Sequence, residues 1–306
     1  MNEEVRLSRL RVSRRRALAA GGFLSLGGVL TACGQAASSA PAASAAAAPA
    51  PAAPASGVPA TVMAMLDQAS TCTTTKANIE GPYWFDVDSL RSDVREDRPG
   101  TPLTVAMRVH NTSACATGGT AVAVPNTVVE LWHCDAGGIY SGFETGSRNA
   151  KPFKVPKGGT GAPPSGATPP PESSRGGDDA IGNPSHGSYS DGDTQSPITD
   201  DGTYLRGAQV TDAAGIVMFT TIFPGWYVGR TVHIHVKVHQ DKKTVLTSQL
   251  YFTEDTIAAA HSAAPYNEHT GRDTTNDTDA FFDKAATLST SDPAGKVAAI
   301  NLGIAI

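Results

Sequence analysis

The feature that most constrains this chain is a set of short segments in which apolar and polar side chains alternate. Gly, Pro or Asp turns separate these segments, which lie at residues 103–109, 127–133, 215–222, 231–239 and 247–252. Successive side chains of a strand point to opposite faces, so the pattern predicts β-strands. Helical periodicity is scarce, with one short helix expected near 278–288 and a last strand at 296–306. We therefore predict an all-β fold, a β-sandwich with long irregular loops and little helix.

Composition agrees with one β domain better than with a helical one. The 306 residues include 31 glycines and 21 prolines, and only 17% are charged, a balance that suits many turns. Six arginines and two glutamates precede Cys33, so the rest of the chain is more acidic than the net charge of −5 indicates. An acidic chain without a basic stripe argues against nucleic acid as a partner.

Residues 1–33 are typical of an export signal. A twin-arginine motif is indicated by Ser-Arg-Arg-Arg at 13–16, and the apolar run that follows is too short and glycine-rich for a transmembrane helix. Leu-Thr-Ala-Cys at 30–33 resembles a bacterial lipobox that would lipidate Cys33, although an ordinary cleaved signal is the alternative. We expect twin-arginine export and membrane anchoring only through the lipidated N-terminus, outside the cytoplasmic membrane or in the periplasm.

Two low-complexity segments accompany the domain. Residues 34–60 are rich in Ala, Pro and Ser and predict a semi-extended tether, because such a run buries too little apolar surface to fold. Residues 61–306 would form the folded domain. Within it, residues 146–201 form an insertion rich in Gly, Pro, Ser and Asp. It is too long for an ordinary connection, and is either disordered or a lid over a site.

Three cysteines follow the signal, namely Cys72, Cys115 and Cys134. Outside the cytoplasm two of them can pair and leave one odd thiol, but the sequence does not choose the pair. Their spacing fits no zinc ribbon.

The candidate chemistry begins with two histidines on one strand face. His233 and His235 are two residues apart in a predicted strand, so their imidazoles point to the same side. Such a pair can bind one metal ion without backbone strain, although an isolated His-x-His is more often a polar-face pair. We expect the remaining histidines to be structural or solvent-facing: His110, His133, His186, His239, His261 and His269.

Two tyrosines and an arginine lie on turns near the ends of these strands. Tyr227 and Arg230 belong to a Pro-Gly turn that leads into the histidine strand, and Tyr140 follows a glycine turn after another strand. A tyrosine there is ordinarily a partly buried amphipathic residue, but phenolate oxygen is also a hard anionic metal ligand. Zinc sites mostly use Cys, His or carboxylate, and blue copper needs Cys with His. Two phenolates with two imidazoles favour Fe(III).

Taken together, these motifs resemble the intradiol ring-cleavage dioxygenases, which include catechol and protocatechuate dioxygenases. The resemblance covers most of the chain after about Cys72. It rests on W-H-x-x-x-x-G-x-Y-S, which ends at Tyr140-Ser141, and on G-R-x-x-H-I-H, which ends at His235. The leader at the N-terminus points to an exported lipoprotein branch of the family. The short connection between Tyr227 and the histidine strand departs from the cytoplasmic enzymes, so the substrate identity does not carry over.

The resemblance implies an activity, an iron site and a pocket. The activity would be cleavage of a catechol-type ring between its two hydroxyls by O2, giving a cis,cis-muconate-type product from a small aromatic diol. By motif, mononuclear non-haem Fe(III) would be bound by Tyr140, Tyr227, His233 and His235. Catalysis would involve Arg230, Tyr227 and Gln249, and the substrate would meet Arg230, Gln249, Pro82 and Tyr83. Tyr83 is equally interpretable as a core residue, and neither the particular catechol nor the oligomeric state is predicted.

Two other functions remain compatible with parts of the pattern. One is a non-catalytic β-sandwich binding module of the cell envelope, which the loss of any one of the four ligands would have favoured. The other is a metal-storage or copper-handling lipoprotein that uses only the two histidines. The absence of Met-rich or Cys-rich runs argues against that second alternative.

Overall fold

A computed structural model of the protein describes residues 57–148, 183–292 and 296–306. The predicted signal, nearly all of the predicted tether and residues 149–182 of the insertion lie outside the described residues. No helix in the described ranges is long and apolar enough to cross a membrane.

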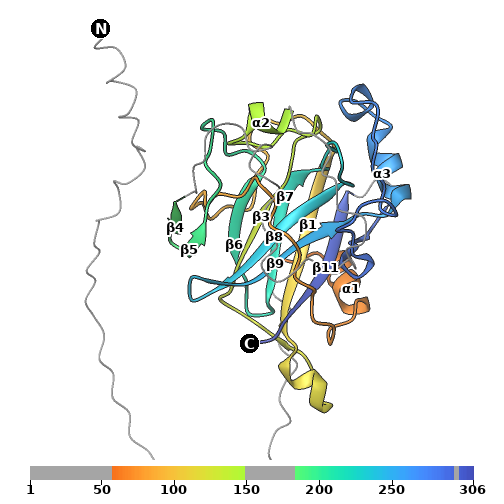
Figure 1. Cartoon of the computed structure of the whole chain (residues 1–306). Coiled ribbons are helices and arrows are strands. Elements are labelled where there is room, and N and C mark those ends of the chain that lie inside the picture. Colours follow the sequence, from red (N-terminus) through yellow and green to blue (C-terminus); the bar gives the residue numbers. More distant parts are fainter. Residues whose placement is uncertain (1–56, 149–182, 293–295) are drawn as a thin grey trace, which may run out of the picture. The chain divides into compact units, whose positions relative to one another are not determined.

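The described chain forms two β-sheets packed as a sandwich, as the sequence predicts (Figure 1). One sheet contains β10 (Ser289–Thr290), β11 (Val297–Ile304), β1 (Pro102–Asn111), β2 (Val122–Ala123) and β7 (Ile216–Ile222). The other has the order β6 (Arg206–Val210), β3 (Val128–Trp132), β8 (His233–Gln240) and β9 (Lys243–Tyr251). A separate hairpin pairs β4 (Pro184–His186) with β5 (Asp191–Thr194). All five alternating segments and the C-terminal apolar stretch are strands.

The two sheets enclose one hydrophobic core. Ile234, Val236 and Val238 of β8 are fully buried in it, together with Val105 and Met107 of β1 from the other sheet. Burying each such side chain stabilises the fold by roughly 1.5–3 kcal/mol. The alternation in β8 therefore fixes which way the strand faces, and its polar side chains must lie on the outer face of the sheet.

That outer face is itself covered by loops. Every residue of β8 except the last is buried. Asn78 donates its backbone N–H to Thr247 O of β9, and Glu80 and Asp193 both contact Lys237 of β8. The polar side chains of the outer face therefore lie in a buried layer between the sheet and its loop cover.

The helix predicted near 278–288 is wrong. That segment contains one 3-10 turn, η5 (Lys284–Ala286). Its acidic side chains bind nearby backbone N–H groups: Asp279 Oδ1 accepts from Phe281 N, and Asp283 Oδ1 accepts from Ala285 N. Such local bonds compete with helical ones and fix an irregular loop.

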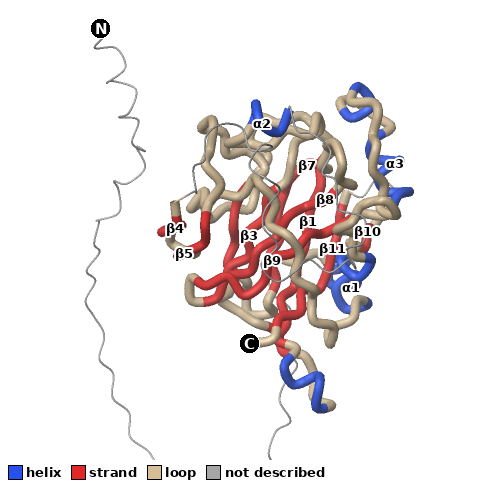
Figure 2. Tube along the Cα trace, viewed as in Figure 1, coloured by secondary structure: helices blue, strands red, loops and turns tan. Residues whose placement is uncertain are grey.

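Helices form elsewhere, at the edges of the sandwich (Figure 2). They are α1 (Ala60–Gln68), α2 (Glu144–Arg148) and α3 (Glu254–His261), with 3-10 turns η2 (Ser113–Thr117) and η4 (Tyr266–Glu268). Thr253 caps α3 by accepting a hydrogen bond from Thr256 N. The first helix, α1, begins at Ala60, which is the last residue of the predicted tether.

The disulfide joins Cys72 to Cys115, and Cys134 is a buried free thiol. Replacing both bridged cysteines by alanine should lower the free energy of unfolding by about 4 kcal/mol, because the bridge closes a loop of some 43 residues in the unfolded chain. Denaturant unfolding measures the loss, and reduction of the natural protein should reproduce it. Equal stability of the oxidised and reduced proteins would contradict the prediction.

Candidate metal centre

The four predicted metal ligands meet on the outer face of the second sheet. His233 and His235 project from β8, Tyr227 lies on the turn before this strand, and Tyr140 lies on the loop after β3. Ring centroids are 4.7 Å apart for the two histidines, 5.6 Å for Tyr227 and His233, 5.6 Å for the two tyrosines, and 6.0 Å for Tyr140 and His235. The four rings therefore surround one point, and each ring lies next to two of the others.

The ring nitrogens and phenol oxygens of these four residues are suited to bind a metal ion. His233 Nδ1 donates to Thr231 O at 2.6 Å, so its Nε2 carries the lone pair, and this Nε2 lies 3.1 Å from His235 Nε2. Tyr140 Oη and His235 Nδ1 are buried and have no hydrogen-bond partner in the described structure. Buried polar atoms ordinarily have partners. A cation bound by the two Nε2 atoms and Tyr140 Oη would give Tyr140 Oη a partner, while Thr231 O orients the His233 imidazole.

Burial also sets the protonation of these groups. It lowers the pKa of His233 and His235 well below the ordinary value, so both imidazoles are neutral, the form that binds metal. Burial raises the pKa of Tyr140 and Tyr227, with the positive charge of Arg230 opposing the rise at each. The phenols therefore ionise only when a strong positive charge is brought to them.

The two phenols are also needed to make up a ligand set. Among the residues that the structure describes, no group of three or more His, Cys, Asp or Glu side chains is placed to hold a metal. Hard phenolate oxygen with imidazole nitrogen suits a hard, highly charged cation such as Fe(III).

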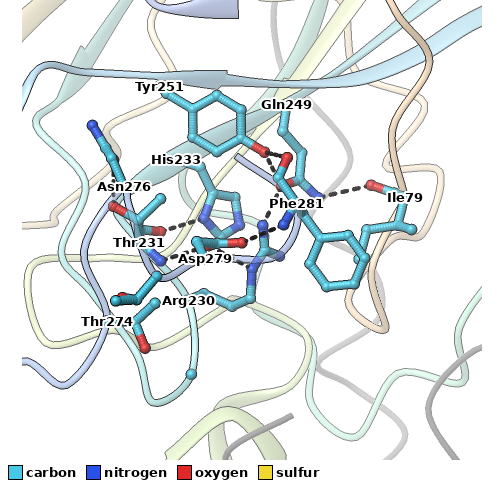
Figure 3. Close-up of polar contacts among 12 residues, drawn as sticks. Ile79, Arg230, Thr231, His233, Gln249, Tyr251, Thr274, Asn276, Asp279 and Phe281 are labelled. Carbon is cyan, nitrogen blue, oxygen red and sulfur yellow. Dashed lines mark hydrogen bonds and ion pairs between the residues drawn. The ribbon is translucent and has the colours of Figure 1, made fainter. Parts of the chain in front are cut away.

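Arg230 lies beside the ligands and is held from two sides (Figure 3). Its Nε donates to Asp279 Oδ2 at 2.9 Å, and its Nη2 donates to Gln249 Oε1. Asp279 also accepts from Thr231 N at 2.7 Å. Burial opposes the charge of Arg230, but Tyr227 and Asp279 outweigh it and raise the pKa, so the guanidinium stays charged.

Both polar atoms of the Gln249 side chain form hydrogen bonds with protein groups. Its Oε1 accepts from Arg230 and lies 2.9 Å from Tyr251 Oη, and its Nε2 donates to Ile79 O at 2.8 Å. Tyr251 Oη also donates to Phe281 O at 2.7 Å. These hydrogen bonds hold Gln249 against the Arg230 guanidinium, and the substrate contact that the sequence predicts for Gln249 stays a prediction.

The predicted pocket-wall segment reaches the ligands. The ring centroid of Tyr83 lies 4.8 Å from that of Tyr140 and 6.4 Å from that of Tyr227. Gly81 has φ +79°, and a Cβ added there would lie 3.1 Å from His235 Cε1, so glycine allows the backbone to run against this imidazole. Tyr83 is buried and Pro82 half-buried, so Tyr83 lines the ligand cluster and packs in the core at once.

Comparison with known proteins gives a match by structure. No protein-family model and no curated protein matches the chain. An intradiol ring-cleavage dioxygenase from Tetranychus urticae is 26% identical with a TM-score of 0.56, covering 76% of this chain and 95% of its own. A crystal structure of a second dioxygenase is 28% identical, with the same TM-score and coverage. These neighbours support the intradiol ring-cleavage dioxygenase family and an oxygenase activity.

Sequence reasoning missed two residues of this candidate site. Asp279 holds Arg230 from a segment that was predicted to be a helix, 49 residues further along the chain. Arg206 of β6 donates two hydrogen bonds to Ser141, the residue after Tyr140. No local signal marks either residue, because each reaches the site through the tertiary fold.

The other histidines behave as expected, and His133 makes a testable case. Its Nδ1 lies 2.8 Å from Cys134 O and its Nε2 lies 2.7 Å from Thr221 Oγ1, far from any ligand role. Burial lowers the pKa of His133 from 6.5 to about 4. The unfolded chain therefore takes up a proton at this residue below about pH 6.5, whereas the folded chain does so only near pH 4.

Acid should therefore weaken the fold. We expect His133 to contribute a loss of about 3 kcal/mol in unfolding free energy between pH 6.5 and 4, since one pKa unit corresponds to about 1.4 kcal/mol. Denaturant titrations across this range test it. The variant His133→Asn should show a correspondingly flatter pH dependence, whereas the exposed His186→Asn should match the natural protein. Parallel pH curves for all three would contradict the assignment.

Proposed function

We propose that this chain is a mononuclear non-haem Fe(III) intradiol dioxygenase that cleaves a small catechol-type diol with O2 to a cis,cis-muconate-type product. One observation carries the proposal: two tyrosines and two histidines converge around Nε2 atoms 3.1 Å apart, beside a charged arginine. The intradiol neighbour at 26% identity supports the same reaction class.

Each protein group of the site would have a distinct role in the reaction. Tyr140, Tyr227, His233 and His235 would hold Fe(III), which would supply Lewis acidity toward a catechol when bound. As a metal-bound phenolate that has already released its own proton, Tyr227 Oη would accept one substrate proton, because its burial favours the neutral phenol. Arg230, kept charged by Asp279, would stabilise negative charge that develops on the ring. Tyr83 would limit access of water to the ligand cluster.

The two alternatives account for less of the structure. A non-catalytic binding module gives no reason for four converging ligands with unpartnered polar atoms. A storage or copper-handling protein that uses the two histidines leaves the adjacent tyrosines and the Arg230–Asp279 pair without a role. The dioxygenase proposal uses all of them.

We also propose that the chain is exported by the twin-arginine route and lipidated at Cys33, as in an exported lipoprotein branch of the family. The sequence motif supports this, and the Cys72–Cys115 bridge suits an oxidising compartment. Membrane fractionation of cells that express the natural chain and Cys33→Ser tests it. The natural chain should sediment with membranes and the variant should not; equal distribution contradicts lipidation.

The function is tested by visible absorption of the detergent-solubilised full chain after ferric reconstitution. Phenolate-to-Fe(III) charge transfer should give a visible band, and catechol added without oxygen should move it to longer wavelength. His235→Ala should lose the band, whereas His186→Ala, an exposed residue, should keep it. A natural chain that stays colourless would remove the dioxygenase proposal and favour the binding module.

A further inference from the structure

Arg206 is a buried cation without a carboxylate partner. It is 1% exposed, its Nε donates to Ser141 Oγ and its Nη2 to Ser141 O, both at 2.8 Å. Its Nη1 is buried and has no partner in the described part of the chain. Arg230, the other arginine of the site, pairs with Asp279, but Arg206 forms no salt bridge with a described residue. An unpaired buried charge is costly, so its retention here requires a reason.

The surroundings place this charge against the loop that carries Tyr140. The Arg206 guanidinium lies over the rings of Phe85 and Phe143, with Cζ 4.5 Å and 5.6 Å from their centroids. Phe85, Phe143 and Tyr140 belong to one buried cluster. Both hydrogen bonds of Arg206 go to Ser141, which directly follows Tyr140 in the chain. The guanidinium is therefore fixed against the loop that presents this phenol.

Arg206 is also in register with the metal face of the sheet. It pairs with Trp132 of β3, which in turn pairs with His235 of β8. The Trp132 and His235 rings stack with centroids 4.8 Å apart and planes 8° apart. One row across three strands thus contains the unpaired cation, an aromatic spacer and a metal ligand, and Tyr140 lies beside that row.

We infer that Arg206 is the permanent counter-charge of Tyr140 when this residue binds the metal as a phenolate, and that it is a positioning residue of the metal centre. The inference rests on the proposed function. When Tyr140 binds as phenolate, its proton leaves to solvent and its oxygen carries a negative charge inside the protein. Arg206 then has the partner that it lacks in the metal-free chain. Arg230 and Arg206 both favour the anion at Tyr140, but the charge of Arg230 is already shared with Asp279, so Arg206 is the one of the two that lacks a carboxylate partner among the described residues.

Mutual electrostatics support this geometry. Burial lowers the pKa of Arg206 to about 10, and Tyr140 is the strongest influence opposing that change. In the other direction, burial raises the pKa of Tyr140, and both Arg230 and Arg206 act against the rise. A charged Arg206 and an anionic Tyr140 would therefore stabilise each other through space, without a direct ion-pair contact.

The test compares three variants of the full chain: Arg206→Gln, Arg206→Lys and Ser141→Ala. Fe(III) is titrated into each variant, and visible absorption gives both the affinity for Fe(III) and the position of the charge-transfer band. Arg206→Gln should bind Fe(III) on the order of tenfold more weakly, because it removes a unit charge from a poorly screened site. Its charge-transfer band should lie at longer wavelength, since a phenolate without its counter-charge gives up electron density more readily. Ser141→Ala, which keeps the charge and loses one hydrogen bond, should retain the natural band.

Folding of each variant is checked by circular dichroism and cooperative thermal unfolding. A folded Arg206→Gln with natural band position and affinity contradicts the role of Arg206. Should this variant fail to fold, Arg206→Lys decides, because it keeps the charge and loses the planar fork: the natural band position supports the inference, and a band at longer wavelength contradicts it. A natural chain that stays colourless contradicts instead the proposed function, so the two failures are distinguishable.

Discussion

Replacing Asp279 by asparagine is expected to lower kcat/KM for a catechol by about a hundredfold, because an ångström of misplacement at a reacting group has an effect of this size. Asp279 is the charged acceptor for Arg230 Nε and for Thr231 N. Asparagine retains the shape and one acceptor oxygen but removes the charge that fixes the guanidinium. The loss should fall mainly on kcat, since Arg230 acts on charge that develops during the reaction.

The ferric absorption band should survive Asp279→Asn, because no metal ligand is changed. Asp277→Asn is the matched control, since it makes the same change two residues away at an exposed position. Natural kcat/KM in Asp279→Asn would show that Arg230 needs no partner. Loss of the band would instead assign Asp279 to the support of the metal ligands.

The second large effect is on stability. Replacing Lys237 by methionine should lower the free energy of unfolding by about 3 kcal/mol, because removal of one partner leaves buried charges uncompensated. Lys237 Nζ lies 2.6 Å from Glu80 Oε2, 2.9 Å from Asp193 Oδ2 and 3.3 Å from the ring centroid of Trp84. The estimate is at the low end of the usual range because both carboxylates keep about a third of their exposure.

Denaturant unfolding of Lys237→Met measures this loss. Lys243→Met is the control, since Lys243 is 71% exposed and lies 4.0 Å from Asp191, and exposed substitutions stay within about 0.5 kcal/mol. Equal stability of Lys237→Met and Lys243→Met would contradict the prediction. It would show that Lys237 with its two carboxylates stabilises the fold no more than the exposed Lys243–Asp191 pair does.

The strands and the convergence of two tyrosines with two histidines could be predicted because their signals are local, whereas metal binding by these residues stays a prediction. Alternation from His233 to Val238 fixes which side chains face the core, and the two tyrosine motifs stand on turns next to strands. Arg206, Lys237 and Asp279 could not be assigned roles, since their partners lie tens of residues away in the chain. The helix predicted near 278–288 failed for a related reason, because Asp279 and Asp283 bind backbone groups there in place of helical bonds.

The sandwich places the imidazole pair on a strand whose opposite side is locked into the core, whereas the wall beside them is a loop held by Lys237 and Glu80. If the chain has the proposed function, retention of iron and choice of aromatic ring would therefore be separable traits of this architecture. The loop between Asn78 and Trp84 could then be lengthened or exchanged to admit a different substrate while the histidine strand keeps its alignment. The loop cover is thus the place to look for diversity among proteins built on this plan.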